Sequence, residues 1–178
     1  MKGGKLTYSW DNLDGAFVKF DNKHTLLNQP VSFSTLGGPQ VEHPAAIFQN
    51  STKDWWIAFG TELVGYYPAK LFTTLSGGAC RTSWYGEVYQ DAKAKVKTEM
   101  GTGQFADKKR PSAAYVRTPR YYDLSLFGMA PKDLFFMTPT LSTCYSRTPL
   151  EPDVLPFDNI FFLGGPGEND KGCQWPFP

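Results

Sequence analysis

Asp54-Trp55-Trp56-Ile57-Ala58-Phe59-Gly60 is the most informative stretch of this 178-residue chain. A polar turn at residues 50–54 opens a run of five aromatic and aliphatic residues, and Gly60 ends it. A second run, from Glu62 to Tyr67, follows at once and stops before Pro68. Runs of this length that are rich in aromatic and β-branched residues and bounded by turn residues are typical of hairpin strands. The stretch therefore predicts two antiparallel strands joined by a tight turn.

Further strands are predicted on both sides of this hairpin, at a spacing of roughly ten residues. They are expected at residues 15–20, 31–34, 45–48, 83–89, 113–116, 121–122, 144–145 and 160–163. One segment is predicted to be helical instead. Pro68 can occupy the first turn of a helix and the pair Gly77-Gly78 can end one, so a single short helix is expected over Ala69–Leu75. Many short strands with turn residues between them predict an all-β fold, an antiparallel β-sandwich, rather than an α/β fold.

The composition argues against several classes of function. The chain has 18 Lys and Arg residues against 17 Asp and Glu, so its net charge is +1 and no basic field would hold nucleic acid. No apolar run approaches the roughly twenty residues of a membrane-spanning helix. Cys80, Cys144 and Cys173 form no C-x-x-C pair. We therefore expect no nucleic acid, no membrane, no metal and no cofactor, and the sequence leaves the oligomeric state open.

The predicted strand at 83–89 places one carboxylate among aromatic rings. Alternate side chains of a strand share a face, so Glu87 would lie between Tyr85 and Tyr89, opposite Trp84 and Val88. Taken alone, this pattern is more typical of a solvated glutamate than of a catalytic one. The two tyrosines are candidates for aromatic residues of a substrate cleft, since such rings stack on proline rings or sugars.

Six motifs, in order along the chain, resemble the neprosin family. The paired tryptophans, a Gly-Tyr-Tyr-Pro turn and a Leu-Phe pair resemble the core signature of that family. Trp84-Tyr85-Gly86-Glu87-Val88 is similar to its "WGGEV" motif, and Thr98 to Phe105 to its "TQMGSGHF" motif. The ending matches at Cys144-Tyr145, Phe161-Phe162, Gly164 to Gly167 and Cys173. The resemblance runs from about Gly15 to the C-terminus, so residues 15–178 are expected to form a partial neprosin-type domain after an unassigned segment, 1–14.

The resemblance implies a plant glutamic-type prolyl endopeptidase that is built on a jelly-roll-like β-sandwich and is active in acid. It also implies a proline-rich peptide or protein substrate, no cofactor, and membership of a secreted family. The first eight residues turn polar at once and lack the apolar run of a signal peptide, which leaves the compartment of this chain open.

Two carboxyl groups facing one water would carry that chemistry, one taking a proton from the water and the other polarising the scissile carbonyl. Glu87 matches the second of the family's two catalytic glutamates. We expect the first to lie in a strand upstream of Met1, so that this chain is a truncated or degenerate copy. Glu42, Glu62 and Glu99 are weaker candidates for a replacement. The resemblance also implies a disulfide between Cys144 and Cys173, which leaves Cys80 to pack at the end of the predicted helix.

Two alternatives remain beside the endopeptidase. One is a non-catalytic module that binds proline-rich or glycosylated extracellular proteins through an aromatic face. The other is a chain that does not fold stably, since a sandwich without its first strands exposes edges that can pair with other chains.

Overall fold

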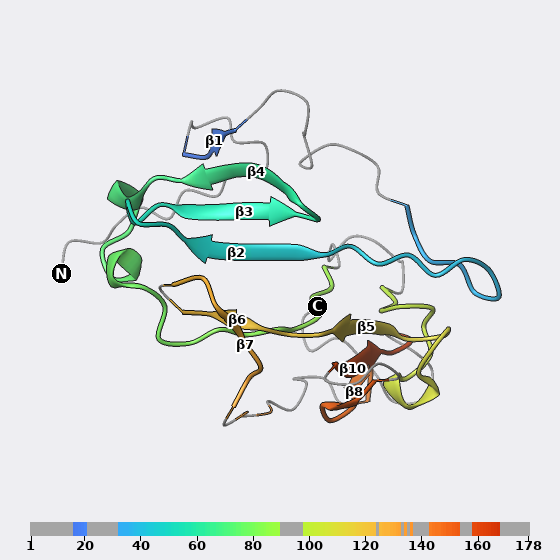
Figure 1. The fold of residues 1–178 in the computed structure, drawn as a ribbon. Coiled ribbons are helices and arrows are strands. Elements are labelled where there is room, and N and C mark those ends of the chain that lie inside the picture. The colour runs from blue at the N-terminus through green and yellow to red at the C-terminus, as the bar shows by residue number, and fades with distance from the viewer. Residues whose placement is uncertain are drawn as a thin grey trace, which may run out of the picture. The chain divides into compact units, whose positions relative to one another are not determined.

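A computed structural model describes residues 16–20, 32–89, 98–123, 125–132, 134, 136, 143–153 and 158–167 (Figure 1). The strand pairs of the two larger sheets are antiparallel, and the helices described within these ranges are single 3₁₀ turns. This confirms the predicted all-β class. None of these helices has the length and apolar character that a membrane crossing requires. The chain divides into two compact units: unit 1 comprises residues 1–33, 41–81 and 122–127, and unit 2 comprises 34–40, 82–121 and 128–178.

Unit 1 contains a sheet of four strands in the order β1-β4-β3-β2 (Figure 1). Its strands are β1 (Val18–Lys19), β2 (Ala45–Gln49), β3 (Trp55–Phe59) and β4 (Glu62–Tyr67). The predicted hairpin is confirmed as β3 and β4, with the predicted bounds. Trp56 pairs with Tyr66 across it, and their rings stack at a centroid distance of 4.7 Å. Aromatic pairing across the two strands therefore helps to set the register.

The polar turn before β3 also holds the chain that follows β4. Asp54 Oδ2 accepts a hydrogen bond from the Thr52 hydroxyl at 2.6 Å, and Asp54 Oδ1 accepts one from the Ala69 N–H at 2.8 Å. The Thr52 hydroxyl, and after it the Ala69 N–H, lower the pKa of the Asp54 carboxyl. Ala69 begins the 3₁₀ helix η1 (Ala69–Leu71), so one carboxylate ties the start of η1 to the sheet.

The helix predicted over Ala69–Leu75 is wrong in its length. The structure has two separate turns there, η1 and η2 (Leu75–Gly77), because Phe72 is extended, with φ −114° and ψ 133°. Neither turn buries a residue. A helix of two turns is marginal in water unless tertiary packing supports it. Gly78, at φ 103°, follows η2, where the sequence predicted a glycine stop.

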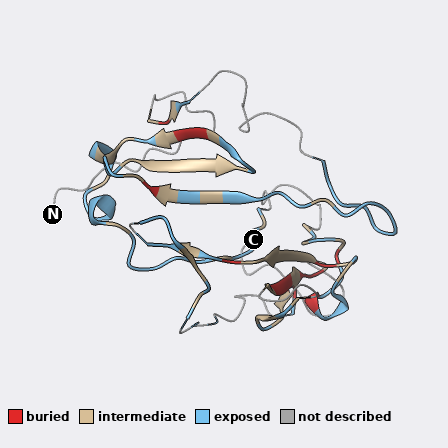
Figure 2. Ribbon diagram, in the orientation of Figure 1, coloured by how far each residue is buried: buried red, intermediate tan, exposed pale blue. Residues whose placement is uncertain are grey.

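Unit 2 is built around β10 (Asn159–Gly164), which pairs with β5 (Ala114–Arg117), β8 (Ser146–Arg147) and β9 (Glu151–Pro152). Figure 2 shows β10 as a buried strand, and its Ile160 and Phe162 are 2% and 4% exposed. They pack with Ala106 of η3 (Ala106–Lys108), which is 1% exposed. Ala106 therefore belongs to the core, although most of its neighbours in residues 102–111 are exposed.

A further pair of two-residue strands, β6 (Tyr121–Tyr122) and β7 (Gly128–Met129), forms a small ladder. Three other predicted strands differ from the structure. The described part of 31–34 forms no strand, and Phe33 is 77% exposed. Residues 83–89 form none either, and the strand expected at 144–145 begins at Ser146. Alternation of side chains predicts which residues share a face, but a strand also needs a backbone partner.

Candidate functional site

The segment 83–89 carries the predicted catalytic position and pairs with no strand in the described structure. The predicted alternation of its side chains is nevertheless present. Trp84 and Val88 are partly buried, whereas Glu87 is exposed and Tyr85 and Tyr89 are 69% and 83% exposed. Glu87 and the two tyrosines therefore face solvent.

Two residues on the opposite side anchor this segment to unit 2. Val88 packs with Met100 against a buried pair, Cys144 and Tyr145. Gly86 approaches the same region so closely that an added Cβ would lie 2.8 Å from the Met100 sulfur and 3.2 Å from a Leu163 methyl carbon. Glu87 lies between these anchored positions, so its backbone is held while its carboxylate points outward.

Hydrogen bonds connect the same region to the other motifs of unit 2. The Thr98 hydroxyl donates to the Tyr89 carbonyl at 3.2 Å, and the Tyr145 hydroxyl donates to the Thr98 carbonyl at 2.7 Å. The N–H of Met100 donates to the Gly165 carbonyl at 3.0 Å. Burial raises the pKa of the Tyr145 phenol, so it stays protonated as a donor. Four of the sequence motifs therefore meet around the segment that presents Glu87.

The Glu87 carboxylate forms no hydrogen bond or ion pair with any residue that the structure describes. Of the three glutamates considered as replacement partners, Glu42 and Glu62 belong to unit 1. Glu99 belongs to unit 2, and its carboxylate lies over Gly103, where an added Cβ would be 2.7 Å from Oε1. Within the described ranges no three His, Cys, Asp or Glu side chains gather to hold a metal ion.

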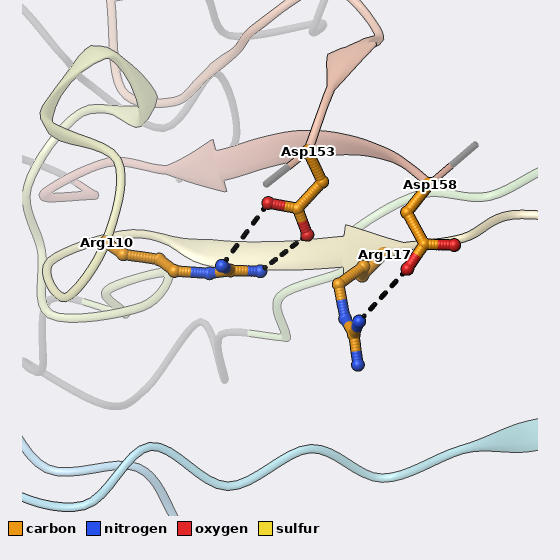
Figure 3. A network of polar contacts seen from close by, with 4 residues as sticks. All are labelled: Arg110, Arg117, Asp153 and Asp158. Carbon is orange, nitrogen blue, oxygen red and sulfur yellow. Dashed lines mark hydrogen bonds and ion pairs between the residues drawn. The ribbon is translucent and has the colours of Figure 1, made fainter. Parts of the chain in front are cut away.

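Unit 2 also contains a set of ion pairs that sequence analysis missed (Figure 3). The Arg110 guanidinium lies 3.2 Å from Asp153, whose side chain is 8% exposed, and it stacks over the ring of Tyr115 at 4.5 Å. Arg117 on β5 pairs with Asp158 at 3.2 Å. The partners are more than 40 residues apart in sequence, so no local pattern could have identified them. These pairs join β5 and the loop before it to the chain beside β9 and β10.

The cysteines and the paired tryptophans have the following environments. Cys80 is an exposed free thiol, so the prediction that it packs at a helix end is wrong. Cys144 is 1% exposed and is not a free thiol, while Cys173 lies outside the described residues. Trp56 packs against Phe20 as well as Tyr66, and the Trp55 indole N–H donates to the Leu75 carbonyl at 3.2 Å. Both tryptophans thus have structural contacts.

Comparison with known families gives a match over most of the chain. The family model described as Neprosin matches residues 2–166, which is nearly the whole chain. The matched region contains residues 84–88, 98–105 and 144–145, the segments that converge around Glu87. It also contains both strands of the hairpin in unit 1.

Proposed function

The chain belongs to the Neprosin family, and from that membership we propose that it is related to glutamic-type endopeptidases that cleave peptide bonds next to proline in acid, with Glu87 as the one catalytic glutamate that it retains. The observation that carries the proposal is the position of Glu87. It occupies the glutamate position of a family motif, between two residues that are anchored to unit 2, and its carboxylate is exposed. A peptide and a water molecule can therefore reach it.

The proposed chemistry assigns Glu87 one of two carboxyl roles. As a carboxylate it takes a proton from the attacking water, while a second, protonated carboxyl donates a hydrogen bond to the scissile carbonyl. The second group then passes its proton to the amine that leaves. Two carboxyl groups that face one water do not both ionise easily, so one remains protonated in mild acid. This is the physical reason for expecting activity at acid pH.

Tyr85 and Tyr89 are the proposed aromatic residues of the substrate cleft. Their side chains are 69% and 83% exposed, and they lie on either side of Glu87 in sequence. Exposed aromatic rings offer flat apolar surfaces on which a proline ring can stack. Proline near the scissile bond would therefore be favoured over residues with flexible polar side chains.

A second candidate is a non-catalytic module that binds proline-rich or glycosylated extracellular proteins. It is favoured by one observation, that Glu87 has no hydrogen-bonded carboxyl partner among the described residues. Such a module would use Tyr85 and Tyr89 for contact and would not need the charge of Glu87.

A quenched fluorescent peptide with a central proline, incubated in mild acid, separates the two candidates. If a second carboxyl completes the pair, the wild-type chain should cleave it, and Glu87→Gln should lower kcat/KM by roughly 100-fold or more, the usual contribution of a general acid or base. Asp107→Asn is the matched control, because it removes an exposed carboxylate from the same unit. Cleavage that survives Glu87→Gln would refute the proposed role. Binding without cleavage, equal in wild type and Glu87→Gln, would support the module.

A further inference from the structure

The turn between β2 and β3 contains an acceptor sequence for N-linked glycosylation, which the proposed function does not use. Asn50-Ser51-Thr52 has the pattern of an asparagine, then any residue except proline, then a serine or threonine. No other asparagine of the chain begins this pattern. A pattern of three residues also arises by chance, so its place in the fold decides whether it can carry a glycan. A glycan is bulky and polar and needs a turn at the surface.

The three residues lie in an exposed hairpin turn. Ser51 and Thr52 are exposed, and Asn50 is partly exposed. The Asn50 N–H donates to the Asp54 carbonyl at 3.1 Å, and the Lys53 N–H donates to the Asn50 carbonyl at 3.0 Å, which closes the turn. A group attached to the Asn50 side chain would therefore extend from the end of the hairpin without breaking the pairing of β2 with β3.

Hydrogen bonds fix which atom of the Asn50 amide faces the turn. The Asp54 N–H donates to Asn50 Oδ1 at 2.9 Å, and the Thr52 hydroxyl lies 2.9 Å from the same oxygen. A backbone N–H can only donate, so the atom that faces it must be the oxygen. The Nδ2 nitrogen of Asn50, the atom that carries an N-linked glycan, forms no hydrogen bond with any residue that the structure describes.

The face of the hairpin that Asn50 shares is also apolar. Gln49 points to the opposite face, where its Nε2 donates to the Leu75 carbonyl at 3.0 Å. Because side chains alternate along a strand, Asn50 lies on the same face as Phe48. A shallow hollow of about 190 Å³ on this face, within unit 1, is lined by Ala46, Phe48, Tyr122 and Leu126. A sugar on Asn50 would thus lie beside an aromatic ring.

We propose that Asn50 is an N-glycosylation site and that the first sugar of the glycan packs on the Phe48 ring. The donor is an oligosaccharide joined through pyrophosphate to a lipid, and a transferase of the secretory pathway catalyses the step. Nδ2 forms a bond to the anomeric carbon of the first N-acetylglucosamine, the bond from that carbon to the pyrophosphate breaks, and Nδ2 gives up one of its two protons. The Thr52 hydroxyl completes the triplet that the transferase recognises. The C–H groups of the sugar then cover part of the flat apolar face of Phe48.

Expression of the full chain behind a cleavable secretion signal, in cultured mammalian cells that add only high-mannose glycans, tests the site. The secreted chain and the chain retained in the cells should both carry one glycan, because transfer takes place as a chain enters the secretory pathway. After trimming by an endoglycosidase, tandem mass spectrometry should find the remaining sugar on Asn50. Thr52→Ala should abolish the glycan as Asn50→Gln does, whereas the matched control Ser51→Ala changes the unrestricted middle position and should retain it. An unmodified Asn50 in both fractions, or a glycan that survives Thr52→Ala, would overturn the proposal.

Thermal unfolding tests the packing of the first sugar, and it needs no cleavage of a substrate. The fully glycosylated chain and the chain trimmed to one sugar should share a Tm roughly 2–4 °C above that of the unmodified chain, made in cells that cannot synthesise the lipid-linked donor. Phe48→Leu removes the ring and keeps an apolar side chain, so its glycosylated and unmodified forms should unfold at the same temperature. Equal Tm values for the trimmed and unmodified wild type, or a difference that persists in Phe48→Leu, would show that the sugar does not pack on this ring.

Discussion

Gly164 lies where β10 passes closest to the chain before η3, and replacing it with alanine should destabilise unit 2. A Cβ added there would overlap the Gln104 carbonyl oxygen and would lie 3.2 Å from the Ala106 nitrogen. Both neighbours are backbone atoms and cannot rotate away. Ala106 is 1% exposed, and its N–H donates to the Ser146 hydroxyl at 2.9 Å, so that side is fixed as well.

The expected magnitude follows from this geometry. Carbon and carbonyl oxygen atoms normally stay about 3.3 Å apart, so relieving the overlap requires a backbone shift on the order of 1 Å. Overpacking of a core usually costs about 1–3 kcal/mol, and a clash with backbone belongs at the upper end of that range. For a chain of this length, about 3 kcal/mol lowers Tm by roughly 6–12 °C.

Thermal unfolding followed by circular dichroism and tryptophan fluorescence measures the effect, with two alanine controls. Gly77→Ala adds the same methyl group where no atom lies within 4 Å, so Tm should stay nearly unchanged. Gly86→Ala meets chiefly the flexible end of Met100 at 2.8 Å and should cost less than about 1 kcal/mol. If Gly164→Ala unfolds within about 1 °C of Gly77→Ala, the argument from close backbone packing is refuted.

Two further predictions concern carboxylates. Hydrogen bonds lower the pKa of Asp54 below its ordinary 3.8, so they stabilise the folded chain above that pH and lose their effect as pH falls through the folded pKa. Asp54→Asn should therefore flatten the decline of unfolding free energy below about pH 4, measured by urea titration, and an unchanged slope would contradict the assignment. Asp153→Ala should cost about 1–2 kcal/mol, less than the loss of a fully buried pair because the Arg110 side chain is 33% exposed. Asp107→Ala breaks an exposed pair and should cost under about 0.5 kcal/mol; equal costs for the two would argue against the burial effect.

The sequence by itself determined the hairpin and the all-β class. The runs Trp55–Phe59 and Glu62–Tyr67 are bounded by turn residues, and their strand character depends on local side-chain preference, which a sequence displays directly. The same holds for the alternation around Glu87: Trp84 and Val88 are partly buried and Tyr85, Glu87 and Tyr89 are exposed, although residues 83–89 pair with no strand in the described part of the chain. The motifs were also sufficient to indicate the family that the chain matches.

Only the tertiary structure decided which of these segments pair, pack or remain exposed. The helix expected at Ala69–Leu75 became two turns because no core surface supports it, and Ala106 entered the core because β10 passes over it. Arg110 met Asp153 across more than 40 residues. Strand pairing, burial and ion pairs involve residues that are distant in sequence. These interactions form, and contribute to stability, only when folding brings the residues together.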